Sequence, residues 1–248
     1  MLFGYIFMEN TNDTKEIGVE KKELIERMFD AGTHYGYSKS RRHPSSKGYI
    51  FGTKNKTDIF DLEKTSDALI NAKKFISEVA MSGKSILFVS SKPEAGKLIK
   101  ETAESIGEPY VIGRWIGGTL TNFDTIKKRV AKLIDLTSKR ESGALSKYTK
   151  KEQLLMSREE EKLEEKFGGI SGMSTYPGAI FVIDLKKEDI VVKEAKVKKI
   201  PIVSLSSSDC DLKLADYPIP GNDTNQKSIS FFLKEIASAH KAGKMSKK

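Results

Sequence analysis

The chain of 248 residues is long enough to bury a sizeable core, either in one large domain or in one domain with an insertion. Lysine and arginine outnumber the acidic residues by 43 to 34, which gives a net charge of +9 and a pI near 9.3. This charge favours a polyanionic partner, in the first place nucleic acid and in the second an anionic membrane surface. Cys210 is the only cysteine, which excludes an intrachain disulfide and a cysteine-based zinc site and fits a reducing cytoplasm.

The first residues and the apolar runs of the chain show whether it carries a signal peptide or a transmembrane helix. Residues 1–7 are apolar, but they lack the basic region and the small-residue cleavage site of a signal peptide. We therefore expect residues 1–19 to be a disordered or mis-assigned leader, with Met8 as the initiating methionine. No later apolar run approaches the roughly 18 residues that a transmembrane helix requires.

A block of charge of one sign follows the first predicted helix. Residues 20–31 carry apolar side chains at helical spacing and end at Gly32, which predicts a helix. Between Asp30 and Asp58 the chain holds no acidic residue. The cations of this stretch, called the basic block below, are Lys39, Arg41, Arg42, Lys47, Lys54 and Lys56. The aromatic and imidazole side chains interleaved with them are His34, Tyr35, Tyr37, His43, Tyr49 and Phe51.

The composition of the basic block predicts contact with RNA. Lysine and arginine neutralise phosphates, and aromatic side chains stack on unpaired bases. The alternative is a solvated loop whose aromatic side chains belong to the core. We expect a core position for Tyr49, Ile50 and Phe51, whereas His34 and Tyr35 either contact RNA or pack the end of the helix.

Strand and helix patterns alternate after the basic block. Residues 85–90 form a continuous apolar run, as in a strand that is buried on both faces. The expected strands are 49–52, 57–60, 85–90, 109–112, 179–184, 200–205 and 217–219. The expected helices outside the hairpin run from a cap at Asp61 or Thr65 to about 79, and over 94–106, 187–198 and 225–240. This alternation predicts an α/β fold with a parallel sheet and helices on both of its faces.

A helical hairpin interrupts the alternation. Residues 122–167 hold two charged amphipathic helices with a break at Ser142-Gly143, which is typical of an antiparallel coiled-coil hairpin that projects into solvent. The second helix is rich in acidic residues. The cations of the first helix contact RNA or protein, or else form a solvated face of ion pairs; they are Lys127, Lys128, Arg129, Lys132, Lys139 and Arg140.

Two glycine pairs, a tryptophan and an arginine mark the base of the hairpin in the sequence. Gly117-Gly118 precedes the hairpin and Gly168-Gly169 follows it, and glycine pairs permit sharp backbone turns and close packing. We expect Trp115, the only tryptophan, to anchor the hairpin to the sheet, and Arg114 to contact RNA. The chain then divides into a leader (1–19), an α/β domain (20–121 and 168–240), the hairpin (122–167) and a disordered basic tail (241–248).

Patterns for enzymatic chemistry are weak. Ser82-Gly83-Lys84-Ser85 resembles the end of a phosphate-binding loop, but it precedes its strand, and the upstream position that requires glycine holds Glu78. Asp184 stands where a catalytic or ribose-binding acid would stand, although a turn-forming aspartate is the stronger interpretation. We predict no catalytic residue, no cofactor and no metal site.

One loop and three histidines hold residue types that can bind a metal. Asp209, Cys210, Asp211 and Asp216 form either a metal-binding loop or, with more support, an ordinary polar loop, because they lack the spacing of a calcium loop and have no histidine nearby. His34, His43 and His240 are too few and too scattered for a metal cluster.

A series of motifs resembles the bacterial small-subunit ribosomal protein S-two family. Their order and spacing match from about Lys22 to Ala242. They are Ala31-Gly32-Thr33-His34-Tyr35-Gly36, Arg41-Arg42-His43-Pro44, Tyr49-Ile50-Phe51-Gly52-Thr53-Lys54-Asn55-Lys56, Leu62-Glu63-Lys64-Thr65, Arg114-Trp115-Ile116-Gly117-Gly118-Thr119-Leu120-Thr121-Asn122, Leu163-Glu164-Glu165-Lys166-Phe167-Gly168-Gly169-Ile170, Phe181-Val182-Ile183-Asp184 and Pro218-Ile219-Pro220-Gly221-Asn222-Asp223. The chain departs from the family near Tyr37 and Gly113, where histidine is frequent, and between Ser206 and Asp211.

The resemblance implies a flavodoxin-like parallel sheet with an inserted coiled-coil hairpin. It also implies a structural, non-enzymatic protein of the 30S subunit in the cytoplasm, which lies between head and body as a monomer, binds 16S ribosomal RNA and supports translation. The partners that it implies are neighbouring small-subunit proteins and, where present, the large mRNA-binding protein S-one. The alternative is a nucleotide-binding α/β enzyme that shares only the fold.

Overall fold

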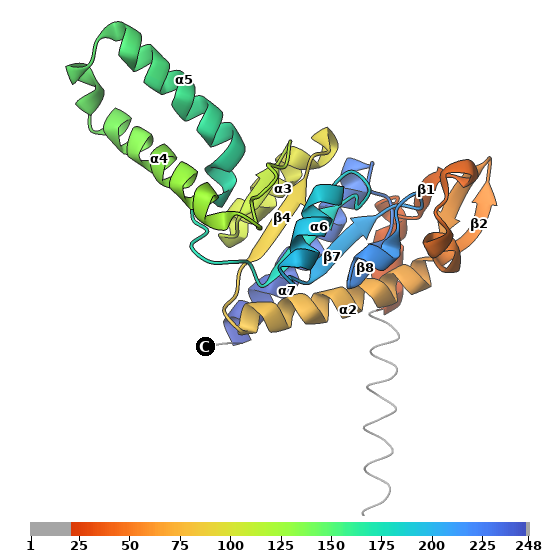
Figure 1. Ribbon diagram of the computed structural model, residues 1–248. Helices are drawn as coiled ribbons and strands as arrows, with labels where there is room; N and C mark the ends of the chain where they lie inside the picture. The colour runs from red at the N-terminus through yellow and green to blue at the C-terminus, as the bar shows by residue number, and fades with distance from the viewer. Residues whose placement is uncertain (1–20, 247–248) are drawn as a thin grey trace, which may run out of the picture.

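The computed structural model describes residues 21–246, so the expectations for the leader and for Met8 lie outside the described residues. Figure 1 shows a sheet layered between helices, with a helical hairpin that projects from one end and a small second sheet at the other. Within the described range, no helix combines the length and apolar character needed to cross a membrane.

A parallel sheet forms the centre of the molecule. Its strand order is β5-β4-β6-β7-β8, and each neighbouring pair is parallel. The strands are β4 (Ile86–Ser90), β5 (Tyr110–Ile112), β6 (Ala179–Ile183), β7 (Ile202–Ser206) and β8 (Tyr217–Pro220). This arrangement confirms the predicted α/β class and is consistent with a flavodoxin-like fold.

Apolar side chains on both faces of the sheet explain the two-sided cover. Alternate residues of a strand point to opposite faces, so Ile86 and Phe88 join one core cluster and Leu87 and Val89 join the other. The first cluster packs against α2 (Leu62–Met81), α3 (Pro93–Ile106) and α7 (Gln226–Ser246). The second packs against α6 (Asp189–Val197) and the base of the hairpin. The run of buried residues in β4 and β6 is the pattern that predicted them.

The second sheet is antiparallel and has the order β1-β3-β2. Helical residues 21–30 lead into it through Gly32, whose φ of +70° suits the predicted helix end. Its strands are β1 (Tyr35–Ser38), β2 (Ile50–Lys54) and β3 (Thr57–Phe60), and the short 3-10 turns η1 (Lys39–Arg41) and η2 (Pro44–Tyr49) connect β1 to β2. The β2–β3 pair was predicted, whereas β1 was not.

The hairpin consists of α4 (Phe123–Glu141) and α5 (Lys150–Phe167), joined through η3 (Ala144–Lys147). Thr149 and Glu152 form a capping box, in which each side chain satisfies a backbone N–H of the first turn of α5. Phe167 ends α5, and η4 (Gly168–Ile170) returns the chain to the sheet. The two predicted helices are confirmed.

The prediction of a disordered tail from residue 241 was wrong for residues 241–246, because α7 continues to Ser246. Gly243 is buried against α2, and a Cβ on it would lie 2.4 Å from the Ser77 carbonyl oxygen, so glycine permits this close helix contact. Lys244 then places its Nζ 2.5 Å from Glu108 Oε1. Packing on α2 therefore stabilises a segment whose sequence looks like a flexible end.

Candidate nucleic-acid interface

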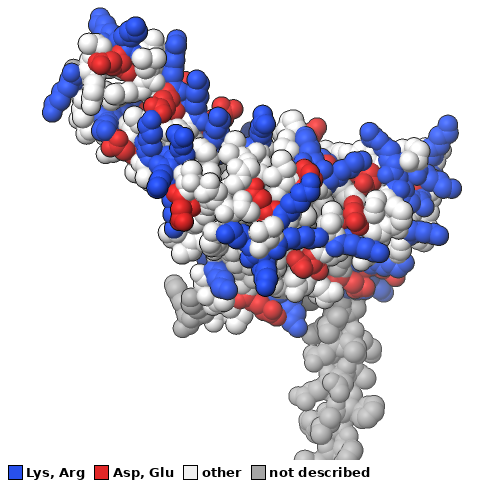
Figure 2. Space-filling view, viewed as in Figure 1, with Lys and Arg blue, Asp and Glu red and all other residues white. Residues whose placement is uncertain are grey.

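The basic block lies on the small antiparallel sheet and on the turns η1 and η2. The structure brings its members to one end of the molecule, where Lys and Arg side chains gather in Figure 2. Five of the six are exposed and have no ion pair within residues 21–246; they are Lys39, Arg41, Lys47, Lys54 and Lys56. These five are the cations of the block that remain free to meet a polyanion.

Arg42, the sixth cation, is already paired. Its guanidinium forms a salt bridge with Asp58, with Nε 2.6 Å from Oδ2, and it also donates to Thr53 Oγ1 at 3.0 Å. Asp58 is fully buried on β3, opposite Thr53 on β2. The hydrogen bond from Arg42 lowers the pKa of Asp58 despite that burial. Arg42 thus supplies the countercharge that the buried carboxylate needs, and it stabilises the sheet that carries the other five cations.

The aromatic side chains of the block divide into packed and exposed groups. His34 is buried and stacks on Phe29 with ring centroids 4.6 Å apart, so it packs the helix end. The Arg41 guanidinium lies 5.4 Å from the centroid of the Tyr37 ring. The expected core position of Phe51 was wrong, because this side chain is 82% exposed. Phe51 stands at a register shift of the edge strand β2, between Ile50, which pairs with Phe60, and Gly52, which pairs with Ile59.

The carboxyl ends of β4 and β6 meet at the position where flavodoxin-like folds bind a ligand. Side chains of the protein fill this position. Lys92 Nζ lies 2.9 Å from Asp184 Oδ2 and 2.8 Å from Asp223 Oδ2. Beside them, the Ser91 backbone N–H donates to Glu188 Oε1 at 2.5 Å. Ion pairs of the protein therefore already occupy the position where a nucleotide phosphate would bind.

The buried charges at the carboxyl ends of β4 and β6, a position called the switch point below, stabilise one another. Burial alone would lower the pKa of Lys92, but Coulombic attraction and hydrogen bonding to Asp223 and Asp184 raise it above its ordinary value. Burial raises the pKa of Asp223 to about 6, against the opposing pull of Lys92. Asp184 is also buried, yet the hydrogen bond from Lys92 brings its pKa below the usual range. The charge of Lys92 is therefore paired inside the protein with Asp184 and Asp223.

Cys210 completes a group of potential metal ligands with Asp184 and Asp223, whose ligand atoms all lie within 4.8 Å of one another. The Lys92 ammonium already lies between the two carboxylates, where a bound cation would stand. Burial raises the pKa of the Cys210 thiol, which donates to Asp184 Oδ1 at 3.4 Å. Asp184 Oδ1 also accepts from the backbone N–H of Lys186, as expected of a turn aspartate.

The polar loop after β7 has structural partners. Asp211 caps the short turn η5 (Leu212–Leu214), Asp216 accepts from the backbone N–H of Ile202 at 2.8 Å, and Asp209 lies 3.3 Å from Lys186 Nζ. These contacts use the aspartates in a loop that packs against the small sheet, which agrees with the ordinary polar loop that the sequence favoured.

Residues 114–121, called the neck below, are held by one buried carboxylate. Glu194 of α6 accepts hydrogen bonds from Trp115 Nε1 at 3.2 Å and from the backbone N–H groups of Gly118, Leu120 and Thr121 at 2.7, 2.9 and 3.1 Å. Burial acts to raise the pKa of Glu194, but these hydrogen bonds hold it below the usual range. Trp115 is also buried in the second core cluster. The predicted anchor is therefore confirmed, and Glu194 is its polar partner.

Arg114 begins the neck and is exposed without an ion pair in residues 21–246. It follows β5, which lies at one edge of the parallel sheet, whereas the basic block packs near the end of β7 through His43 and Ser208. The structure thus does not bring Arg114 together with the basic block.

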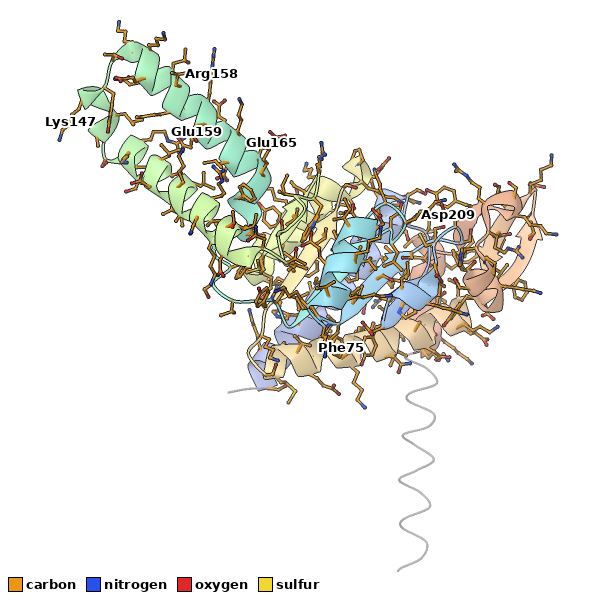
Figure 3. The ribbon with its side chains drawn as sticks, in the orientation of Figure 1. Phe75, Lys147, Arg158, Glu159, Glu165 and Asp209 are labelled. Carbon is orange, nitrogen blue, oxygen red and sulfur yellow. The ribbon has the colours of Figure 1, made fainter. Side chains whose placement is uncertain are left out.

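The hairpin pairs several of its charges across or along its helices. Lys132 forms an ion pair with Glu159, and Arg140 lies 3.1 Å from Glu160. Figure 3 shows Glu159 between the two helices. Lys139 pairs with Asp135 along α4. Half of the cations listed for the first helix are thereby engaged within the hairpin.

Sequence patterns alone do not single out Lys92 or Glu194. For Glu194 the sequence does hold one indication of burial, because this residue lies on the apolar side of α6 between Val191 and Ala195. A charged residue at such a position requires partners. Its donors lie more than 70 positions away along the chain, so the partners become visible only in the fold.

Comparisons with known proteins agree with this geometry. A family model described as Ribosomal protein S2 matches residues 28–243. The small ribosomal subunit protein uS2 of Helicobacter acinonychis (strain Sheeba) is 43% identical over 221 residues, which cover 89% of this chain and 88% of that protein. The protein of the same name from Helicobacter pylori (strain Shi470) is also 43% identical, over 89% of this chain and 82% of its own length. The chain belongs to the ribosomal protein S2 family, whose role is structural, in the small ribosomal subunit, and not enzymatic.

Proposed function

We propose that the chain binds 16S ribosomal RNA between the head and the body of the small subunit, through the exposed cations of the basic block. The observation that carries this proposal is the set of five exposed cations without an acidic partner: Lys39, Arg41, Lys47, Lys54 and Lys56. Phosphates neutralise such cations and release counterions, which gives binding its free energy and its salt dependence.

Exposed aromatic rings support the choice of RNA. Phe51 is 82% exposed and Tyr35 is 51% exposed, and both lie among these cations. Stacking of an unpaired base on such a ring contributes about 1–3 kcal/mol. Arg114 is a separate contact in this proposal, because it lies across the sheet from the block.

The remaining partners follow from the family. We propose that the chain acts as a monomer within the cytoplasmic ribosome and touches neighbouring small-subunit proteins, among them the large mRNA-binding protein S-one where it is present. Arg42 is assigned a structural part in this proposal, since Asp58 holds its guanidinium.

Sedimentation of the tagged chain from a cell lysate tests the proposal. The wild-type chain should migrate with 30S particles in a sucrose gradient, and a variant with Ala at positions 39, 41, 47, 54 and 56 should shift toward the top. A control variant with Ala in place of the exposed lysines Lys193, Lys196, Lys198, Lys199 and Lys213 should migrate as wild type. Wild-type protein found wholly at the top would contradict the ribosomal assignment, and equal behaviour of the block and control variants would contradict the assigned surface.

A further inference from the structure

Helices α3 and α7 pack against each other over the first core cluster and leave an open groove between them. The volume of this groove, called the α3–α7 groove below, is about 500 Å³. Buried Ala237 and half-buried Leu98 line it together with the short side chains of Thr102 and Ser230. Short side chains of this kind allow a further element to approach the two helices closely.

The α7 edge of the groove carries a row of lysines. Lys234 and Lys241 line the groove, and Lys227 lies seven residues before Lys234 on the same helix. Residues seven apart share one face of an α-helix and are separated by about 10 Å along its axis. All three lysines are exposed, and the ion pairs that α7 forms within residues 21–246 use other residues of the helix. This row is therefore free to meet acidic groups of a partner.

The α3 edge of the groove carries the opposite charge. Glu101 lines the groove, and Glu94 lies seven residues earlier on α3; both are exposed. The ion pair that Glu101 forms with Lys97 spans 3.8 Å between two exposed side chains, and a pair of this kind contributes little. Glu101 and Lys234 line the same groove, yet no ion pair joins them within the described residues. The groove thus separates two edges of opposite charge.

The two edges together favour a protein helix over RNA as the occupant. Phosphates would be attracted by the lysines of α7 but repelled by the glutamates of α3. A helix can carry acidic residues along one side and basic residues along the other, at the same spacing of seven residues. Such a helix satisfies both edges at once, and the order of the charges fixes the direction in which it lies.

We propose that the α3–α7 groove docks an amphipathic helix of a neighbouring small-subunit protein. The helix presents acidic residues to Lys227, Lys234 and Lys241 and basic residues to Glu94 and Glu101. This inference rests on the proposed function, in which the chain touches neighbouring proteins, and it adds the surface and the chemistry of the partner.

Photo-crosslinking of the full chain within 30S particles tests the inference. The photo-reactive residue p-benzoylphenylalanine replaces Ser238 of α7 or, in a second chain, Ser105 of α3, since both line the groove and are exposed. The control chain carries it in place of Lys196, an exposed residue of α6. Particles are isolated on a sucrose gradient and irradiated, and the adducts are identified by mass spectrometry after nuclease and protease digestion. Both groove positions should yield an adduct on one protein segment with acidic residues at helical spacing, and position 196 should not.

Charge reversal then tests whether the lysine row selects the partner. K227E/K234E/K241E should reduce the adduct at position 238 about fivefold or more, per chain present in the 30S fraction, because it places like charges opposite each other. The matched control K196E/K199E/K213E reverses three exposed lysines elsewhere and should leave the yield unchanged. Circular dichroism should show the same helix content in both variants.

The outcomes separate this inference from the proposed function. An adduct on a protein segment of the expected charge pattern, weakened by the reversal, supports the inference. An adduct on 16S ribosomal RNA, an adduct on a segment without this charge pattern, or no adduct above the level at position 196 overturns it, as does an adduct that the reversal leaves unchanged. In each of these cases the chain is present in the particles, so the proposed function stands. A chain that is absent from the 30S fractions before irradiation contradicts the proposed function and, with it, the inference.

Discussion

The switch point of the parallel sheet and the basic block differ in how their cations are placed: the lysine of the first is buried and paired, and most cations of the second are exposed and unpaired. Lys92 is buried between Asp184 and Asp223 with both carboxylates within 2.9 Å, whereas Lys39 and four further cations of the block are exposed and form no ion pair in residues 21–246. Both are lysines that follow a strand. The difference separates charge that stabilises the fold from charge that is available to a partner, and only the second kind supports binding of a polyanion.

The comparison also shows which side chains lie at the carboxyl ends of the strands in this α/β sheet. In a flavodoxin-like fold, the crevice at the carboxyl ends of the strands is the ligand site. Here Lys92 and Asp184 occupy it as an ion pair, and Glu188 accepts a hydrogen bond from the Ser91 backbone N–H. Exposed cations that form no ion pair within the described residues lie away from this crevice, among other places on the small sheet and the hairpin.

The largest expected effect tests the switch point. Lys92→Met should lower the free energy of unfolding by about 4 kcal/mol, because it leaves two buried carboxylates without their countercharge. Urea unfolding followed by circular dichroism measures it. Lys97→Met, at an exposed position of α3, the helix that begins directly after Lys92, is the control and should change stability by less than about 0.5 kcal/mol. A loss for Lys92→Met no greater than that of the control would show that the ion pairs are not structural.

The next effect concerns the neck. Glu194→Gln should cost about 2–3 kcal/mol, because an amide keeps one acceptor but turns its NH2 group toward backbone donors. Labels placed on the hairpin and on α2, in a chain whose single buried cysteine has been replaced, should show a broader distance distribution by pulsed electron paramagnetic resonance. A distribution as narrow as that of wild type would mean that Trp115 packing alone orients the hairpin.

The pH dependence of stability is a second test of the role of Glu194. The pKa of Glu194 is lowered in the folded protein, so its contribution to stability is complete above the ordinary glutamate pKa of about 4.5 and is lost as pH falls through the folded value. The difference in unfolding free energy between wild type and Glu194→Gln should therefore be largest near pH 7 and should shrink below about pH 4.5. A difference that stays constant down to pH 3 would contradict the assigned hydrogen bonds.

The smallest effect distinguishes two adjacent arginines within the block. Arg42→Ala should cost about 2 kcal/mol of stability, since it leaves the buried Asp58 carboxylate unpaired. Arg41→Ala should leave stability within about 0.5 kcal/mol and should weaken RNA binding about threefold to tenfold, because its exposed guanidinium lies over the Tyr37 ring and forms no ion pair in residues 21–246. Thermal unfolding and RNA binding of both variants check the assignment, and reversed results would exchange the two roles.

The parts of this molecule that sequence predicts are those encoded over short stretches of chain. The strands β4 and β6 stand out because they are buried on both faces and therefore read as unbroken apolar runs. The basic block stands out for a similar reason, since the absence of acidic residues is visible along one segment.

The parts that sequence misses depend on contacts between distant segments. β1 has no distinctive pattern and exists because it pairs with β3. The end of α7 looks like a flexible tail until Gly243 meets Ser77. Arg42 looks like any other cation of the block until β3 brings Asp58 beside it. In each case a partner far along the chain decides the role of the residue.

The most direct test of the account is the salt dependence of binding to 16S ribosomal RNA for the wild-type chain and for K39A/R41A/K47A/K54A/K56A. If the five exposed cations contact phosphates, wild-type affinity should fall roughly a thousandfold between about 50 and 200 mM salt, and the slope of the variant should be flatter by about 4. The variant should unfold at the same urea concentration as wild type, because none of these cations forms an internal ion pair in residues 21–246. An unchanged slope in a correctly folded variant would contradict the account, since the RNA contacts would then lie elsewhere on the molecule.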